Sequence, residues 1–266
     1  MKTIIVIPAR FESTRYPGKP LVELRGATGQ STTLVERSWR AAKQVKGVDR
    51  VVIATDDVRI MEKAHEFGAE VVMTSKCCEN GTERCAEVIK KLEKHYDIVV
   101  NFQGDAPLTP VWFVEELINA INQNPMYQVA TPVLKCEPRM ILDLIEDRQN
   151  GRVGGTTVVF DHAFSALYFS KEVIPYASEE DLRLGKVCVY HHVGVYVYSA
   201  RALSQYANSK SGALERSEGL EQLRFLENNQ KVLCVEVDAK GRQFWELNNP
   251  VDVKKLEIMM IEMGME

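Results

Sequence analysis

The chain begins with an apolar run that breaks into a short basic loop, Ile4-Ile5-Val6-Ile7-Pro8-Ala9-Arg10-Phe11-Glu12-Ser13-Thr14-Arg15-Tyr16-Pro17-Gly18-Lys19-Pro20-Leu21. Four successive apolar residues predict a strand that is buried on both faces, as in a parallel sheet. Three cations, Arg10, Arg15 and Lys19, follow within the loop. A loop that leaves the carboxyl end of a parallel strand can present backbone N–H groups and positive charge to one polyanion. This stretch therefore predicts an anion site, most plausibly for a nucleotide triphosphate.

The alternative is a surface loop whose cations are merely solvated. Pro17 and Pro20 favour the anion site, because they stiffen a segment that would otherwise be mobile. The loop is not a Walker A loop. No glycine stands five residues before Gly18, and Pro20 follows Lys19 where Ser or Thr should stand.

Composition indicates one globular domain, since 266 residues with 45% hydrophobic and 26% charged residues can bury a sizeable core. The net charge of −4 argues against a nucleic-acid partner, because such proteins usually carry a basic excess. No stretch approaches the length of a membrane span and no signal peptide is seen, so a cytoplasmic location is expected. Six cysteines without zinc-like spacing are interpreted as reduced, packing thiols.

Strands and helices alternate after the first loop. We expect a helix capped by Thr33, a buried strand over 50–57, a helix over about 58–67 and a strand over 69–73. This alternation predicts a parallel sheet with right-handed crossovers. Thr55 and Asp56 end the second strand and are candidate nucleotide contacts. Asn80-Gly81-Thr82-Glu83-Arg84 then reads either as a plain helix cap or as an anion or ribose contact at a helix amino terminus.

A second buried strand motif is Asp97-Ile98-Val99-Val100-Asn101-Phe102-Gln103-Gly104-Asp105-Ala106-Pro107. It places Asp105 on the same sheet edge as the first loop. A carboxylate beside phosphates suits Mg²⁺, which takes oxygen ligands, whereas a turn-capping aspartate is the alternative.

The remaining pattern is less regular. A helix capped by Thr109 and a strand over 128–133 precede a loosely patterned, mobile excursion over about 134–153, and strands follow over 156–161 and 165–171. One strand over 191–198 would put His192 and Tyr196 on one face. A helix over 214–224 would turn Glu215 and Gln222 toward either substrate or water. A strand over 232–237 and a helix capped at Asn249-Pro250 complete the chain.

These motifs resemble the sugar-acid cytidylyltransferases, most closely the 3-deoxy-manno-octulosonate cytidylyltransferase (CMP-Kdo synthetase) family. The resemblance rests on several segments that follow the family's order, namely residues 8–21, Gly81-Thr82-Glu83-Arg84, Gln103-Gly104-Asp105, Ala166-Leu167-Tyr168-Phe169-Ser170, His192-Val193-Gly194-Val195-Tyr196 and Leu214-Glu215-x-x-Glu218-x-Leu220-Glu221-Gln222-Leu223-Arg224.

The resemblance implies a Rossmann-like nucleotide-diphospho-sugar transferase fold, α/β with a mostly parallel sheet. It implies a single domain over 1–266 with a smaller mixed sugar-binding and dimerisation lobe at about 134–230. The implied reaction joins CTP to a 3-deoxy-octulosonate-type sugar acid and releases pyrophosphate, for lipopolysaccharide or surface-glycan synthesis. Mg²⁺ is the implied cofactor and a homodimer the implied assembly.

The resemblance also implies the site residues. Arg10, Lys19 and Asp105 take the catalytic roles. The nucleotide contacts are Pro8, Ala9, Arg10, Ser13, Arg15, Lys19, Thr55, Asp56, Gly81, Thr82, Arg84 and Gln103. The sugar acid lies against Gln103, His192, Tyr196, Glu215 and Gln222, and the metal is held by Asp105 and the residue at position 248.

Four positions depart from the family pattern, the first being Asn80, which replaces the usual serine. Ala106 replaces a glutamate, Lys171 an arginine and Asn248 the second metal-binding aspartate. A neutral amide oxygen should lower metal affinity unless Glu246, Asp252 or phosphate oxygens compensate. We therefore hypothesise an acceptor other than plain Kdo, such as an amino-substituted relative. The alternatives are another sugar nucleotidyltransferase, such as an acylneuraminate type, and an inactive nucleotide-binding relative.

Overall fold

The first strand, β1 (Thr3–Ala9), alternates its side chains between two cores. Ile5 and Ile7 belong to one apolar cluster, Ile4 and Val6 to another, and all four are fully buried. A strand can be apolar at every position only when helices cover both sheet faces. The predicted strand with two buried faces is therefore confirmed.

The computed structural model describes residues 1–12, 16–104, 107–152, 155–242, 245–247 and 249–266. Its further strands are β2 (Glu23–Arg25), β3 (Ser31–Thr33), β4 (Arg50–Thr55), β5 (Glu70–Met73), β6 (Ile98–Phe102), β7 (Val129–Lys135), β8 (Thr156–Phe160), β9 (Ala166–Ser170), β10 (Tyr190–His192), β11 (Val195–Ser199) and β12 (Val232–Glu236). Its helices are η1 (Lys19–Leu21, a 3-10 turn), α1 (Leu34–Ala42), α2 (Val58–Glu66), α3 (Gly81–Lys91), α4 (Val111–Gln123), α5 (Pro138–Gln149), α6 (Glu179–Arg183), α7 (Ala200–Asn208), α8 (Ala213–Glu218), α9 (Leu223–Glu227) and α10 (Asp252–Glu262).

One large sheet runs through the molecule in the order β5-β4-β1-β6-β11-β7-β10-β8-β9, and β12 pairs with β7 off this path. Pairing is parallel among β5, β4, β1 and β6 and between β7 and β12. The strands from β11 onward pair antiparallel with their neighbours along the path. The predicted α/β fold is confirmed.

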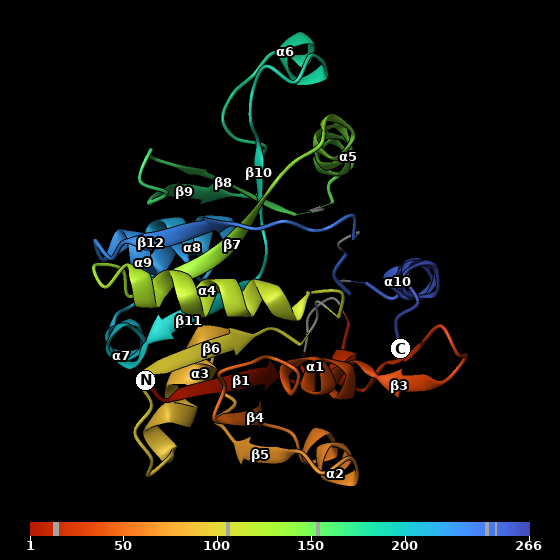
Figure 1. The fold of residues 1–266 in the computed structure, drawn as a ribbon, viewed down its shortest axis with the longest axis vertical. Helices are drawn as coiled ribbons and strands as arrows, with labels where there is room; N and C mark the ends of the chain where they lie inside the picture. Colours follow the sequence, from red (N-terminus) through yellow and green to blue (C-terminus); the bar gives the residue numbers. More distant parts are fainter. Residues whose placement is uncertain (13–15, 105–106, 153–154, 243–244, 248) are drawn as a thin grey trace.

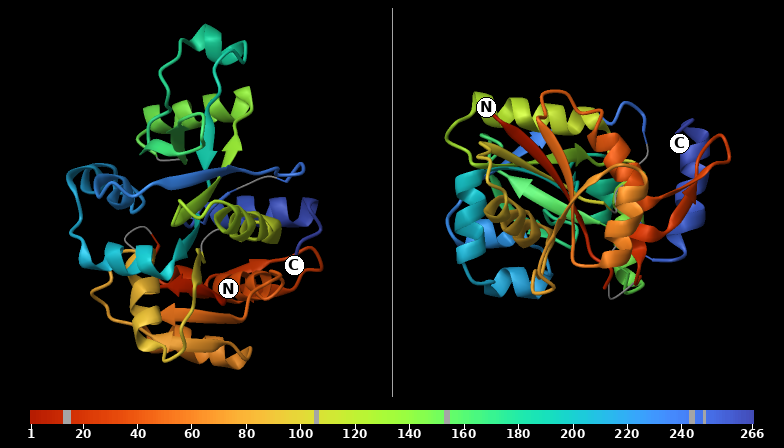
Figure 2. Two further views of the ribbon diagram at one scale, coloured as in Figure 1. Left: turned by 60° about the vertical axis from the view of Figure 1, so that its left-hand side comes forward. Right: turned by 90° about the horizontal axis from the view of Figure 1, so that it is seen from below.

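Helices cover both faces of the sheet (Figures 1 and 2). The cluster that contains Ile5 and Ile7 takes residues from α1, α2 and α4, whereas the cluster that contains Ile4 and Val6 takes residues from α3, α7 and α9. A third cluster joins α10 to β2 and to the start of α1 through Leu24, Leu34 and Leu256. None of the helices that the structure describes has both the length and the apolar composition to cross a membrane.

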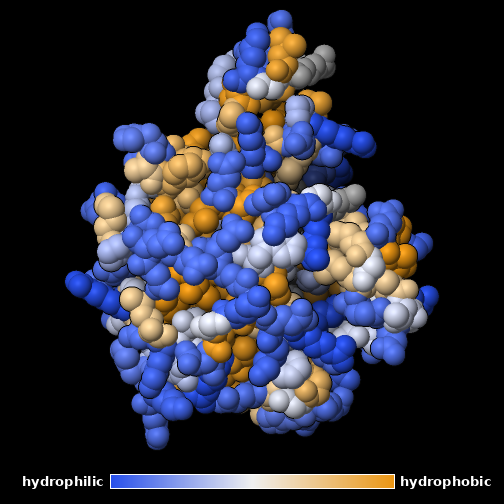
Figure 3. All heavy atoms as spheres, viewed as in Figure 1, coloured by the Kyte–Doolittle hydropathy of each residue, from blue (hydrophilic) through white to orange (hydrophobic). Residues whose placement is uncertain are grey.

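A segment between β7 and β10 projects from one end of the molecule and carries α5, β8, β9 and α6 (Figures 1 and 2). Figure 3 shows a largely hydrophilic face on which apolar atoms also appear at this projecting end. The excursion expected over 134–153 is wrong for most of its length, because α5 spans Pro138–Gln149. Ile141 is the buried residue of that helix, and Met140, Leu144 and Ile145 pack, partly buried, against the same small apolar cluster.

Two other expected elements are broken in the structure. The single strand over 191–198 is divided into β10 and β11 at Val193 and Gly194. The helix over 214–224 is divided into α8 and α9, because Gly219 takes a left-handed conformation with φ of 62°. Both breaks lie beside the cavity described below, where they redirect side chains.

Helix caps differ from the expectations at three places. Thr33 precedes α1 without a side-chain cap bond among the described residues, and α4 begins after Pro110, one residue later than expected. Asn80 does cap α3 as predicted, since its side chain accepts from the Glu83 N–H at 2.9 Å. The cap expected at Asn249-Pro250 is wrong, because α10 begins at Asp252 after Val251, and the Asp252 carboxylate instead accepts from the Asn249 N–H at 2.6 Å.

Candidate functional site

A cavity of about 910 Å³ lies at the carboxyl edge of β1 and β6. It is lined from five directions: the loop after β1, the start of α3, the end of β6, the β10–β11 break and the α8–α9 break. The lining residues used below are Pro8, Ala9, Arg10, Lys19, Glu79, Asn80, Gly81, Arg84, Gln103, Gly104, Lys171, His192, Gly194, Tyr196, Glu215, Arg216, Glu221, Gln222 and Glu246. Sequence-predicted contacts for both substrates thus share one cavity.

The loop after β1 folds back on itself. The Gly18 N–H donates to the Phe11 carbonyl at 2.8 Å, and Gly18 has φ of 73°, a conformation that glycine adopts readily. The Arg59 guanidinium lies 3.3 Å from the Phe11 ring centroid and packs that ring from outside the loop. These contacts hold Arg10 and Lys19 at the cavity wall. Ser13 and Arg15, also predicted as nucleotide contacts, lie outside the described residues.

The start of α3 approaches β1 and β6 closely. A Cβ at Gly81 would stand 3.2 Å from the Asn101 amide and 3.4 Å from Pro8, so glycine permits this contact. Thr82 is fully buried and does not line the cavity; its N–H donates to Glu221 Oε2 at 2.9 Å. The predicted contact of Thr82 with a nucleotide stays a prediction.

Thr55 and Asp56 lie behind the cavity rather than on its wall. Thr55 is fully buried, and Asp56 pairs with the Arg84 guanidinium at 3.3 Å. Arg84 also donates to the Thr74 hydroxyl and itself reaches the cavity. Asp56 therefore supports the Arg84 side chain. The predicted role of Asp56 as a direct nucleotide contact stays a prediction.

His192, Tyr196 and Gln222 form a chain of polar contacts on the opposite wall. His192 Nε2 lies 3.0 Å from the Thr131 hydroxyl, and its ring centroid is 5.4 Å from that of Tyr196. The Tyr196 hydroxyl donates to Gln222 Oε1 at 3.1 Å. The Gln222 amide nitrogen is buried and has no hydrogen-bond partner within the described part of the chain. A buried donor normally has a partner, so this one marks a place for a ligand oxygen.

Burial keeps the two neighbouring histidines neutral. It lowers the pKa of His192 to about 3 and that of His191 to about 4. At neutral pH His192 therefore meets a ligand as an uncharged hydrogen-bonding group. Cations at this end of the cavity are Arg216 and Lys171, and the Lys171 amine stands 3.0 Å from the Cβ position of Gly219.

Sequence reasoning missed Glu221. Its Oε1 accepts from Gln103 at 2.8 Å and its Oε2 accepts from the Thr82 N–H, so it joins the ends of β6 and α3. It stands next to Gln222 in a motif that had been interpreted as one continuous helix. The left-handed residue Gly219 is the local signal for the break, because a glycine inside a helical pattern is unfavourable.

The proposed metal ligands Asp105 and Asn248 lie outside the described residues. Among the residues that the structure does describe, no three His, Cys, Asp or Glu side chains gather in a way that could hold a metal ion. Asp252 is buried and accepts from the Asn249 N–H and the Trp245 indole, away from the cavity. Glu246 does line the cavity, so of the two compensating carboxylates it is the better placed.

Comparison with known proteins decides the family, since residues 4–232 match the family model described as cytidylyltransferase. This chain belongs to the cytidylyltransferase family. As such it is a nucleotidyltransferase, and the resemblance drawn from the motifs is confirmed.

Individual cytidylyltransferases are similar over nearly the whole chain. A 3-deoxy-manno-octulosonate cytidylyltransferase of Maricaulis maris is 42% identical over 97% of this chain and 96% of its own length. The mitochondrial enzyme of that name from Arabidopsis thaliana is 37% identical over 99% of this chain and 85% of its own. A solved CMP:2-keto-3-deoxy-manno-octonic acid synthetase complexed with CTP is 31% identical, with a TM-score of 0.84, and covers 99% of this chain and 100% of that one.

Proposed function

We propose that this cytidylyltransferase transfers CMP from CTP to a 3-deoxy-octulosonate-type sugar acid and releases pyrophosphate, for lipopolysaccharide or surface-glycan synthesis. The observation that carries the proposal is the single cavity that faces Arg10 and Lys19 on one wall and the unpartnered Gln222 amide on another. Cations suit the triphosphate, and a buried amide donor suits an oxygen-rich acid. Similarity to a structure complexed with CTP supports the same assignment.

The chemistry requires mainly positioning and charge neutralisation. The anomeric hydroxyl oxygen forms a bond to the α-phosphorus, the bond from that phosphorus to the bridging oxygen of pyrophosphate breaks, and the hydroxyl proton passes to solvent. Arg10 and Lys19 would offset the charge that gathers on the phosphate oxygens. Gln222, Tyr196 and neutral His192 would orient the acid, so that the two reacting atoms meet in line.

Mg²⁺ is our proposed cofactor. The donor chemistry fits, because a carboxylate at Asp105 and an amide oxygen at Asn248 are the oxygen ligands that Mg²⁺ takes, and Gly104 and Glu246 line the cavity. When bound, the ion would offset phosphate charge and lower the pKa of the attacking hydroxyl.

The test is pyrophosphate release with CTP, Mg²⁺ and Kdo. We expect the wild type to turn over, and we expect Asp105→Ala to lower the rate of pyrophosphate release by at least about a hundredfold. The control Asp143→Ala should change the rate little, because the Asp143 side chain is exposed on α5. Asn248→Asp should retain turnover and bind metal more tightly. A silent wild type with an active Asn248→Asp variant would instead indicate a nucleotide-binding relative that has lost the activity.

A competition experiment identifies the sugar acid that the enzyme prefers as acceptor. Because Ala106, Lys171 and Asn248 depart from the family pattern, we propose an amino-substituted relative of Kdo as the preferred acid. Equal concentrations of the two acids with limiting CTP should give mainly the CMP derivative of the amino sugar. A clear preference for Kdo would refute this choice and leave the cytidylyltransferase activity unaffected.

We also propose a cytoplasmic homodimer. All six cysteines are free, which is typical of a reducing compartment. The projecting segment exposes Tyr176 and Leu184, at 94% and 58%, and offers them as the contact between copies. Sedimentation should give twice the 30.1 kDa chain mass, and Leu184→Asp should shift it toward the monomer.

A further inference from the structure

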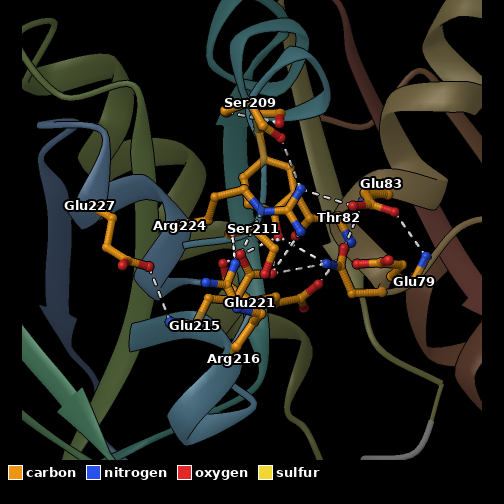
Figure 4. Close-up of polar contacts among 12 residues, drawn as sticks. Glu79, Thr82, Glu83, Ser209, Ser211, Glu215, Arg216, Glu221, Arg224 and Glu227 are labelled. Carbon is orange, nitrogen blue, oxygen red and sulfur yellow. Dashed lines mark hydrogen bonds and ion pairs between the residues drawn. The ribbon is translucent and has the colours of Figure 1, made fainter. Parts of the chain in front are cut away.

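Arg224 in α9 is a buried charge held by three other elements. Only 2% of the residue is exposed. Its guanidinium donates twice to Glu215 of α8, from Nε at 2.6 Å and Nη2 at 2.7 Å, and once to Glu83 of α3, from Nη1 at 2.8 Å. The same group lies 4.2 Å from the ring centroid of Tyr206 in α7. Figure 4 shows the side chains of Arg224, Glu215 and Glu83 converging between the helices.

Through Glu83 the guanidinium reaches the wall predicted to bind the nucleotide. Glu83 Oε2 accepts from the Glu79 N–H at 2.8 Å, and the Glu79 carbonyl accepts from Arg10 at 3.5 Å. Glu79 and Asn80 both line the cavity beside Arg10. Three hydrogen bonds, joined by the Glu83 carboxylate and the backbone of Glu79, therefore link Arg224 to Arg10, a predicted phosphate contact.

Through Glu215 the guanidinium reaches the wall predicted to bind the sugar acid. Glu215 lines the cavity and also faces Asn80, whose amide lies 3.5 Å from Glu215 Oε1 and 2.9 Å from the Tyr206 hydroxyl. The Tyr206 hydroxyl in turn donates to the Glu221 carbonyl at 3.2 Å, one residue before Gln222. The same cluster thus fixes both the α8 carboxylate and the backbone that carries the Gln222 amide.

We propose that Arg224 is a positioning residue that couples the two walls, so that CTP binding prepares the cavity for the sugar acid. The proposal rests on the proposed function, which assigns one substrate to each wall. The geometry requires a planar fork, because three guanidinium nitrogens serve two carboxylates on different helices at once. A lysine ammonium can replace the charge but cannot hold both carboxylates in this arrangement.

The experiment measures binding without turnover. Isothermal titration gives the affinity of Kdo alone and in the presence of saturating α,β-methylene CTP, which cannot release pyrophosphate. In the wild type we expect Kdo to bind about fivefold or more tightly with the analogue present. In Arg224→Lys that ratio should fall below about twofold, while the affinity for the analogue alone changes by less than about threefold.

Two further variants make the result decisive. Arg50→Lys is the matched control, because Arg50 of β4 pairs with Glu70 of β5 and donates to the Tyr96 hydroxyl, away from the cavity. The coupling ratio should stay at its wild-type value. Glu83→Gln leaves the Arg224–Glu215 pair in place and should lower the ratio even if Arg224→Lys does not fold.

The outcomes are distinguishable. A wild-type ratio near one, or an unchanged ratio in a folded Arg224→Lys or Glu83→Gln variant, would overturn the coupling. Failure of the wild type to bind either the analogue or Kdo would instead overturn the proposed function.

Discussion

Gln222 lies on the inner wall of the cavity with its carbonyl oxygen bonded to Tyr196, and its amide nitrogen has no hydrogen-bond partner in the parts of the chain that the structure describes. We expect Gln222→Met, which keeps the size but removes the donor, to raise the KM for the sugar acid by about tenfold, equivalent to about 1.4 kcal/mol. The KM for CTP should stay within about twofold. Steady-state kinetics with each substrate varied in turn checks this, with exposed Gln205→Met on α7 as the control. Equal rises in both KM values would contradict a specific contact.

His191 and His192 give a prediction for acid stability. Burial depresses their folded-state pKa values to about 4 and about 3, below the unfolded value of about 6.5. Between the folded-state and unfolded-state pKa values, the unfolded chain binds more protons than the folded protein. The free energy of unfolding should therefore fall as the pH falls from about 6.5 to about 4. The fall should reach about 1.4 kcal/mol per pH unit for each histidine. Urea unfolding at several pH values measures the slope. His191→Gln should flatten it, whereas exposed His95→Gln should not.

At the scale of elements, the break between α8 and α9 depends on Gly219. With φ of 62° and the Lys171 amine 3.0 Å from its Cβ position, Gly219→Ala should cost about 1–2 kcal/mol of unfolding free energy and displace the lysine. Displacement should raise the KM for the sugar acid. Gly185→Ala is the control, because Gly185 has φ of 64° with nothing within 4 Å and should show the strain without the kinetic change. If Gly219→Ala lowers stability but leaves the KM for the sugar acid unchanged, Lys171 does not contribute to binding of the sugar acid.

The elements also show how far sequence reasoning extends. Strands β1, β4 and β6 could be predicted because both of their faces are buried, so nearly every residue is apolar. Helix α5 was not predicted, because its many charged residues obscure a short apolar stripe in which Ile141 is buried and Met140, Leu144 and Ile145 are only partly buried. Of the predicted site residues, Arg10, Lys19, Gln103, His192 and Gln222 line the cavity. Glu221 and Arg224 were not foreseen, because their roles depend on contacts with α3, more than a hundred residues away.

At the scale of the whole molecule, the third cluster joins the carboxyl-terminal helix α10 to β2 and the start of α1. Leu256 of α10 is fully buried with Leu24, Leu34 and Leu247, and Glu266 accepts from the Thr28 N–H at 2.8 Å. Leu256→Ala should destabilise the protein by about 2–5 kcal/mol. Because Leu247 adjoins Glu246 on the cavity wall, we also expect a lower kcat. Urea unfolding and pyrophosphate release check the two effects, and exposed Ile258→Ala on the same helix should show neither.

The projecting segment begins after Lys135 at the end of β7 and ends before Tyr190 at the start of β10, and these two residues are direct partners across antiparallel strands. The whole segment between these two residues could therefore be exchanged for another, since the hydrogen bonds between β7 and β10 already hold its two ends together. The loop after β1 and the start of α3 would be untouched by such a graft. Related enzymes could then differ in the sugar acid they accept by exchange of this whole segment rather than by single substitutions. A chimera joined at these two positions would test this.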